Sequence, residues 1–342
     1  MIIRKDDLES AVEHGIISAK DARNLSEFTL KRSTAPRAIN EHFRLFSNFS
    51  EVFICLGLSI LFSALNTLIS PSATSPVYTL LTAGGFWVFA EFFTQKTTKM
   101  APALFSVIFS GVLALNAFEY STGIAAAKIF NMNRPDGFLI AAFIAIFALL
   151  AFLRFRIPAL LVIIVAATAG AGVLLTRDTF GNLTFLWSLG ITGAATLATA
   201  IWFDSRDPLR RSRQNAYAFW LFIIGSPLAI HPLFASVWLQ AVDNDKSLPV
   251  FLIVFVLATL VTIAGLLLDR RSLVASSLIY FTVTIGYFNY NLTGSNSLAV
   301  VYTPLLIGTF VIVIGILWYK IRARLLNIIP LGKFKAFLPP SN

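Results

Sequence analysis

The sequence predicts an all-α, polytopic membrane protein with ten transmembrane helices and with both termini in the cytoplasm. Three observations support this prediction. Of the 342 residues, 57% are hydrophobic and only 13% are charged, and the mean hydropathy is +0.77, whereas a soluble domain has about 25% charged residues. Ten long apolar runs follow residue 50. Lys and Arg are concentrated in alternate connections between these runs.

Each apolar run is long enough to cross a bilayer, which takes roughly 20 helical residues with a range of about 17–25. The fourth run is the shortest, and the third is compatible with a helix that continues past Glu119 towards Ala127. The predicted spans are Val52–Ile69, Val77–Thr94, Ala101–Phe118, Gly137–Leu153, Ile157–Thr176, Leu183–Phe203, Ala216–Leu239, Pro249–Leu268, Leu273–Leu292 and Leu298–Tyr319.

The connection Asp204 to Asn215 orients the chain because it carries four arginines between two uncharged runs. Such a basic connection is expected on the cytoplasmic side of a membrane. With this connection inside, all but four of the 27 Lys and Arg residues lie inside; the exceptions are Lys128, Arg134, Arg177 and Lys246. The net charge of +10 therefore marks one membrane face, and we expect no nucleic-acid partner.

Two cytoplasmic segments flank the transmembrane domain of residues 50–320. Residues 1–49 read as a helical hairpin, in which Gly15 suits the left-handed position that ends a helix and Ser18 with Asp21 resembles a capping box. Residues 321–342 mix apolar and basic side chains, and Pro330 and Gly332 interrupt them. This tail is either a basic amphipathic segment in the headgroup plane or a simple stop-transfer tail.

The chain shows no motif for an enzyme, a metal or a cofactor. It has neither a phosphate-binding loop nor a nucleophile elbow nor a metal-binding His/Cys pattern, and Cys55 is its single cysteine. We therefore expect no enzymatic activity. Ala166 and Gly170, like Gly190 and Ala194, have the small-xxx-small spacing of packed membrane helices.

Glu91 is the first candidate for a solute-binding residue because it lies inside the second predicted span. A charged side chain at the centre of a membrane helix costs roughly 2.5–3.5 kcal/mol on insertion scales. One interpretation is a protonatable group that faces a cavity. The other is an interfacial carboxylate paired with Lys96 or Lys99.

Asn116 and Glu119 are three residues apart and share one helical face. They are candidates for the outer end of a polar pathway, and Asn66 on the first span lies at a similar depth. The alternative is an interfacial cluster that includes Tyr120.

The outer end of the ninth span supplies three further candidates, Tyr287, Asn289 and Tyr290. Tyrosines at this depth usually belong to an aromatic belt, but the adjacent asparagines also allow a polar pocket. His231 lies between Pro227 and Pro232, and prolines in a membrane helix free backbone carbonyls and can kink the helix. His231 is thus either part of a gating or binding element or a packing residue.

The two ends of the chain carry a family resemblance. The start, with Gly15, Ile16 and Ser18 between two helical segments, resembles the opening of a bacterial family of multi-pass inner-membrane proteins of unknown function. The end, which closes on Leu338, Pro339 and Pro340, is similar to the basic Leu-Pro-Pro tail of a related uncharacterised family. The resemblance implies a polytopic protein of the bacterial inner membrane and supplies no activity.

Two functional hypotheses follow. The first is a small-solute transporter or permease-like protein that uses the candidates above, with the lipid bilayer and a small-molecule solute as partners. The second is a non-transporting scaffold or sensor that recruits a cytoplasmic protein through residues 1–49. Transporters coupled to ions usually hold more ionisable groups at membrane depth than this chain does, which favours the second hypothesis.

Overall fold

The computed structural model is all-helical. It describes residues 12, 14–25, 49–68, 76–97, 99–123, 134–176, 184–208, 210, 212–242, 247–293, 296–330, 332 and 337–339, and none of them forms a strand. For residues 134–135, 184, 238–242, 247–251, 287–293 and 296–300 the description covers the backbone alone. The predicted fold class is confirmed at this level.

Ten long helices occupy the described part of the chain, and each of the ten predicted spans overlaps one of them. Their bounds are α3 Phe49–Leu68, α4 Pro76–Gln95, α5 Met100–Thr122, α7 Arg134–Phe155, α8 Leu160–Thr176, α9 Thr184–Arg206, α10 Arg213–Val242, α11 Ser247–Leu268, α12 Arg271–Thr293 and α13 Asn296–Ile328. Seven of them are long and apolar enough to cross a membrane, namely α3, α4, α5, α7, α9, α10 and α13. The described parts of α8, α11 and α12 contribute shorter apolar stretches.

Several helices extend beyond the predicted spans. Helix α5 continues past Glu119 and ends at Gly123, whose φ of 71° gives the left-handed conformation of a helix C-cap. The short fourth span lies within a 22-residue helix, α7. Helix α13 has 33 residues and continues to Ile328, so the boundary predicted at residue 320 falls inside a continuous helix.

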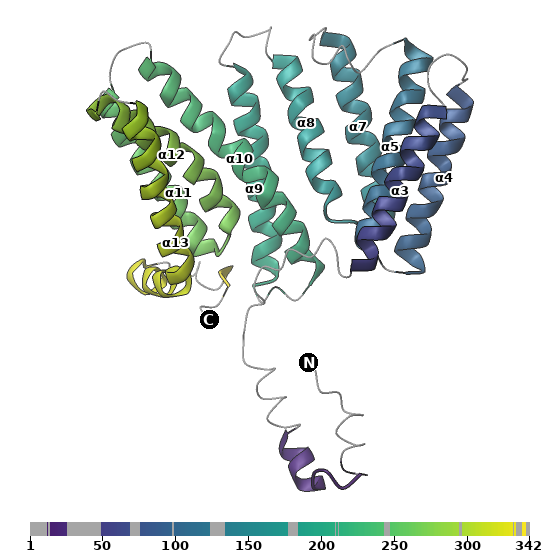
Figure 1. Cartoon of the computed structure of the whole chain (residues 1–342), viewed down its shortest axis with the longest axis horizontal. Coiled ribbons are helices and arrows are strands. Elements are labelled where there is room, and N and C mark those ends of the chain that lie inside the picture. Colours follow the sequence, from purple (N-terminus) through teal and green to yellow (C-terminus); the bar gives the residue numbers. More distant parts are fainter. Residues whose placement is uncertain are drawn as a thin grey trace.

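Apolar side chains form two large core clusters along the row of helices in Figure 1. One cluster lies among α3, α4, α5, α7 and the start of α8, around Phe86 and Leu113. The other lies among α9, α10, α11 and α12, around Phe222 and Phe234. Consecutive helices pair across short turns, as α9 does with α10 and α11 with α12, and helices α8 and α9 join the two halves.

The short helix of residues 19–25 has the predicted start. Gly15 has a φ of 69° and its N–H donates to the carbonyl of Val12. The Ser18 hydroxyl bonds to the Asp21 carboxylate at 2.6 Å, and the Asp21 N–H donates back to Ser18 at 3.1 Å. The predicted left-handed glycine and the Ser18–Asp21 cap are therefore confirmed, whereas residues 1–11 and 26–48 of the predicted hairpin lie outside the described residues.

Candidate functional site

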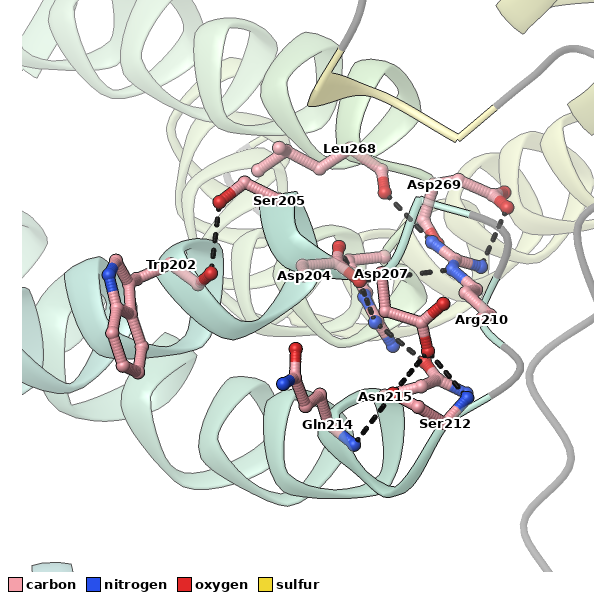
Figure 2. A network of polar contacts seen from close by, with 11 residues as sticks. Trp202, Asp204, Ser205, Asp207, Arg210, Ser212, Gln214, Asn215, Leu268 and Asp269 are labelled. Carbon is pink, nitrogen blue, oxygen red and sulfur yellow. Dashed lines mark hydrogen bonds and ion pairs between the residues drawn. The ribbon is translucent and has the colours of Figure 1, made fainter.

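A cluster of buried charged residues connects α9, α11, α12 and α13. It lies at the helix ends next to the arginine-rich α9–α10 connection. We call it the arginine cluster and define it as Asp204, Arg210, Asp269, Arg270 and Arg322. These residues come from the end of α9, the α9–α10 connection, the α11–α12 turn and the last turns of α13. Figure 2 shows how the α9–α10 connection meets the α11–α12 turn.

The cluster is built around the C-terminal end of α11. The last four carbonyls of a helix have no partner within it, and the aligned peptide dipoles place partial negative charge there. Arg210 donates to the carbonyls of Leu268 and Asp269, both at 3.0 Å, and Arg322 donates to the carbonyl of Leu266 at 3.1 Å. Arginines from two other parts of the chain thus cap α11.

The Asp204–Arg270 pair is the most buried part of the cluster. The Arg270 Nη2 lies 2.5 Å from Asp204 Oδ1, and its Nε donates to Oδ2 at 3.2 Å. Arg270 also donates to Asn215 Oδ1 at 3.0 Å, and its guanidinium lies 5.1 Å from the ring centroid of Phe222. Arg270 is fully buried, so this bidentate contact fixes the start of α12 against α9 and α10 in a water-poor environment.

Asp269 connects the α11–α12 turn to two other helices. Its carboxylate accepts from Arg210 Nη1 at 2.9 Å and from the Trp318 indole N–H of α13 at 2.7 Å. Asp269 and Arg210 have φ of 54° and 55°. A left-handed conformation is unfavourable for residues other than glycine and persists only where the surroundings enforce it. The ion pair between these two residues supplies that enforcement.

Short polar contacts link the described residues of the α9–α10 connection (Figure 2). The Asp207 carboxylate accepts from the backbone N–H and the hydroxyl of Ser212 at 2.6 and 2.7 Å. Ser212 in turn accepts from the Gln214 N–H at 3.2 Å, which is the contact of an N-cap serine. The connection therefore presents Arg210 to α11 in a defined geometry.

The arginine cluster has a structural role, because its charged groups bind one another and the ends of helices. Its carboxylates already accept hydrogen bonds from guanidinium and indole groups, and its guanidinium groups cap helix carbonyls. Three arginines face two aspartates, and all five side chains lie at the protein interior or its edge. A buried pair of this kind is costly to break from one side, because the partner stays buried and unpaired.

Glu91 forms an ion pair with Arg154, which directly follows the fourth predicted span and lies in the last turn of α7. Its Oε1 lies 2.7 Å from Arg154 Nε, and its Oε2 accepts from Arg154 Nη2 at 2.8 Å. Gln95 donates to the same carboxylate at 2.5 Å. The cationic partner of Glu91 is thus Arg154 on α7 rather than Lys96 or Lys99, and the role of Glu91 in solute binding stays a prediction.

We expect Glu91→Gln and Arg154→Gln to lower the stability of the folded protein by the same small amount. The pair is partly exposed, and such pairs contribute about 0–1 kcal/mol to stability. The measurement is the melting temperature of each purified variant in detergent. If Glu91→Gln alone abolished binding of a solute that Arg154→Gln still bound, the carboxylate would have a role beyond this ion pair.

The structure brings together two asparagines, one from α3 and one from α5, near the helix ends opposite residues 49 and 100. Asn116 Nδ2 of α5 donates to Asn66 Oδ1 of α3 at 3.5 Å. Glu119 lies one helical turn further along α5. The candidates at this depth therefore lie near one another, although a solute-binding role for them is still a prediction.

His231 contacts another helix through its side chain. Its Nδ1 is hydrogen-bonded to the hydroxyl of Tyr280 on α12. The Tyr280 ring stacks on Phe234 of α10 with a centroid distance of 4.4 Å. The imidazole thus links α10 to α12 between the two prolines of α10. The side chains of Tyr287, Asn289 and Tyr290 lie outside the described residues, and their backbone belongs to α12.

Helices α9 and α10 approach most closely at Gly193. A Cβ atom on Gly193 would lie 2.2 Å from the backbone nitrogen of Ala229, whereas one on Gly190 would meet Pro232 at 3.5 Å. A Cβ on Gly170 would meet nothing within 4 Å. The small-residue pattern therefore marks the α9–α10 contact, but its tightest point is Gly193, and Gly170 makes no such contact.

The sequence interpretation missed the buried roles of Asp204, Asp269, Arg270 and Arg322. Topology counting treated the arginines as solvated charges of the inner face. The available signal was the presence of Asp204 and Asp269 in otherwise basic connections, because isolated acids beside arginines are candidates for ion pairs.

Comparison with known proteins gave no match to any protein-family model, curated protein or solved structure.

Proposed function

We propose that this chain is a ten-span membrane protein of the bacterial inner membrane, with both termini cytoplasmic, and that it moves a small solute across the bilayer in a permease-like manner. Seven helices already satisfy the length and composition of a span. By their full bounds α11 and α12 have 22 and 23 residues, which gives each roughly 33 Å of helix against a hydrocarbon core of about 30 Å.

The observation that carries the transport proposal is the pair of prolines inside α10. Pro227 and Pro232 lie within its 30 residues, and each proline removes one backbone hydrogen bond, although the helix is continuous from Arg213 to Val242. Many transporters build their solute sites at interrupted membrane helices, and the two missing hydrogen bonds weaken α10 at this point. The segment between the two prolines packs its backbone against Gly193 of α9, so it has both a weakened hydrogen-bond ladder and a fixed point of contact.

Two neighbouring features support this assignment. His231, which is exposed, lies between the prolines and reaches Tyr280 on α12. A groove opens between α9 and α10 near their ends opposite the arginine cluster, and Trp187, Gly190, Pro232 and Ser236 are among its lining residues. A rearrangement of α10 between Pro227 and Pro232 would change both the His231–Tyr280 contact and the width of this groove.

The test is a thermal-stability screen of the full chain in detergent against a metabolite library. A solute present at about 100 times its dissociation constant is expected to add roughly 2.7 kcal/mol to the folded state. His231→Ala should weaken this stabilisation, while His14→Ala, on the cytoplasmic segment, should preserve it. A library without any stabilising compound, on a sample that melts cooperatively, would contradict the proposal.

A second candidate function is a scaffold that recruits a cytoplasmic protein, and one observation favours it. Ile16, next to the left-handed Gly15, is 75% exposed. The short capped helix that follows lies apart from α3–α13 in Figure 1. A contiguous exposed apolar patch marks a docking surface, and Ile16 together with Leu25, which is 38% exposed, supplies the apolar surface of this segment.

The scaffold candidate is tested by co-purification. Ile16→Asp in the full chain is expected to release any protein bound to this segment. Leu25→Asp, at the C-terminal end of the short helix, tests whether the docking surface extends along that helix. An unchanged set of co-purified proteins in both variants would exclude this docking element.

A further inference from the structure

The last turns of α13 present two cations to the outside of the helix row. Helix α13 has 33 residues, or about 50 Å of helix, which exceeds the hydrocarbon core by several turns. Its C-terminal turns, yellow in Figure 1, lie at the same end of the molecule as the arginine cluster. They therefore lie at the depth of the lipid headgroups when α13 spans the bilayer.

One face of these turns is anchored to the protein. Trp318, Arg322 and Leu326, at intervals of four residues, are all buried. Trp318 donates to Asp269, and Arg322 donates to the carbonyl of Leu266 and, at 2.5 Å, to that of Pro339. Because these contacts involve directed hydrogen bonds, they fix the rotation of the helix about its own axis.

The opposite face carries a stripe in which two basic residues are flanked by two apolar residues. Ile316, Lys320, Arg324 and Ile328 also follow one another at intervals of four residues, and all four are exposed. Each residue of the stripe is two positions along the chain from a residue of the anchored face, as Lys320 is from Arg322. Two positions correspond to about half a turn of helix. Within the described residues neither Lys320 nor Arg324 forms an ion pair.

We propose that this stripe, defined as Ile316, Lys320, Arg324 and Ile328, is a binding site for an anionic phospholipid of the cytoplasmic leaflet. The two cations contact the phosphate headgroup. Ile316, on the membrane side, contacts the upper part of an acyl chain. The proposal rests on the membrane orientation proposed above and is independent of solute transport.

The two cations and the apolar contact of Ile316 together favour an anionic phospholipid over other phosphate-containing ligands. A free phosphate has no acyl chain to contact Ile316, and a zwitterionic phospholipid carries its own cation beside the phosphate. A basic residue near an anionic membrane surface contributes about 1 kcal/mol to binding. Removal of both cations is therefore expected to lower the affinity roughly 30-fold.

The test measures lipid binding to the purified full chain in detergent by native mass spectrometry, with phosphatidylglycerol and phosphatidylcholine as ligands. We expect the chain to bind phosphatidylglycerol more tightly, and Lys320→Gln/Arg324→Gln to lose this preference. Arg206→Gln/Arg213→Gln removes two exposed cations of the α9–α10 connection and is expected to keep it. The charge-preserving Lys320→Arg/Arg324→Lys should also keep it.

Three results would overturn the proposal. The first is equal affinity of the wild-type chain for the two lipids. The second is an unchanged preference in Lys320→Gln/Arg324→Gln. The third is displacement of phosphatidylglycerol by millimolar inorganic phosphate, which would assign the site to a free anion. Because both substituted residues are exposed, unchanged melting temperatures without lipid will show that each variant is folded.

Discussion

Replacing Arg270 with alanine is expected to cost roughly 3–5 kcal/mol of stability, out of a total of about 5–15 kcal/mol for a typical protein. The guanidinium is fully buried and holds Asp204 through both carboxylate oxygens. Its loss leaves the Asp204 carboxylate buried without its main partner. The measurement is thermal unfolding of the purified chain in detergent, where the variant should melt well below the wild type or fail to yield folded protein.

The adjacent Arg271 provides a matched control. Its side chain is exposed and lies 5.7 Å from the ring centroid of Trp318, so Arg271→Ala should cost less than about 1 kcal/mol. The double variant Asp204→Asn/Arg270→Gln replaces the charged pair with neutral amides. It should be more stable than the sum of the two single substitutions predicts. Equal melting temperatures for Arg270→Ala and Arg271→Ala would show that the buried pair has no special role.

Gly193→Ala is expected to have the next largest effect. The added Cβ would lie 2.2 Å from the backbone nitrogen of Ala229, and backbone atoms of a packed helix cannot move aside as a flexible side chain can. Overpacking usually costs about 1–3 kcal/mol and occasionally more. Helices α9 and α10 must separate, so both thermal stability and any solute-dependent stabilisation should fall.

Gly190→Ala is the corresponding control on the same helix, because its Cβ would make an ordinary contact of 3.5 Å with Pro232. We expect its melting temperature to stay near that of the wild type. If both variants melted alike, the close approach of α9 to α10 between Pro227 and Pro232 would be wrong.

Helix positions could be predicted from the sequence because membrane-spanning segments carry a strong composition signal. A helix that faces lipid is apolar all around, and its ends are marked by charge, which is why each predicted span overlaps an observed helix. The capped turn at Ser18 was also predictable, because it depends on residues three apart in the chain.

The arginine cluster was not predictable by the same means. Asp204 and Arg270 are 66 residues apart, and no local pattern states which basic residue of a connection turns inward. Arg270 is buried while Arg271 is exposed, although the two residues are adjacent and Arg271 begins α12. The pairing of Glu91 with Arg154 has the same origin, since the contact of α4 with α7 decides it. These outcomes depend on helix packing, which composition does not specify.

The most direct test of the account is the orientation of the two ends of the helices in the membrane. We would replace Cys55, the single cysteine, with alanine and introduce either Ser212→Cys in the α9–α10 connection or Thr122→Cys at the end of α5, both at exposed positions. Intact bacteria expressing each variant are then treated with a membrane-impermeant maleimide. We expect labelling of the variant at position 122 in intact cells, and labelling at position 212 only after permeabilisation. Labelling of position 212 in intact cells, with position 122 protected, would contradict the proposed topology, and with it the cytoplasmic location of the arginine cluster.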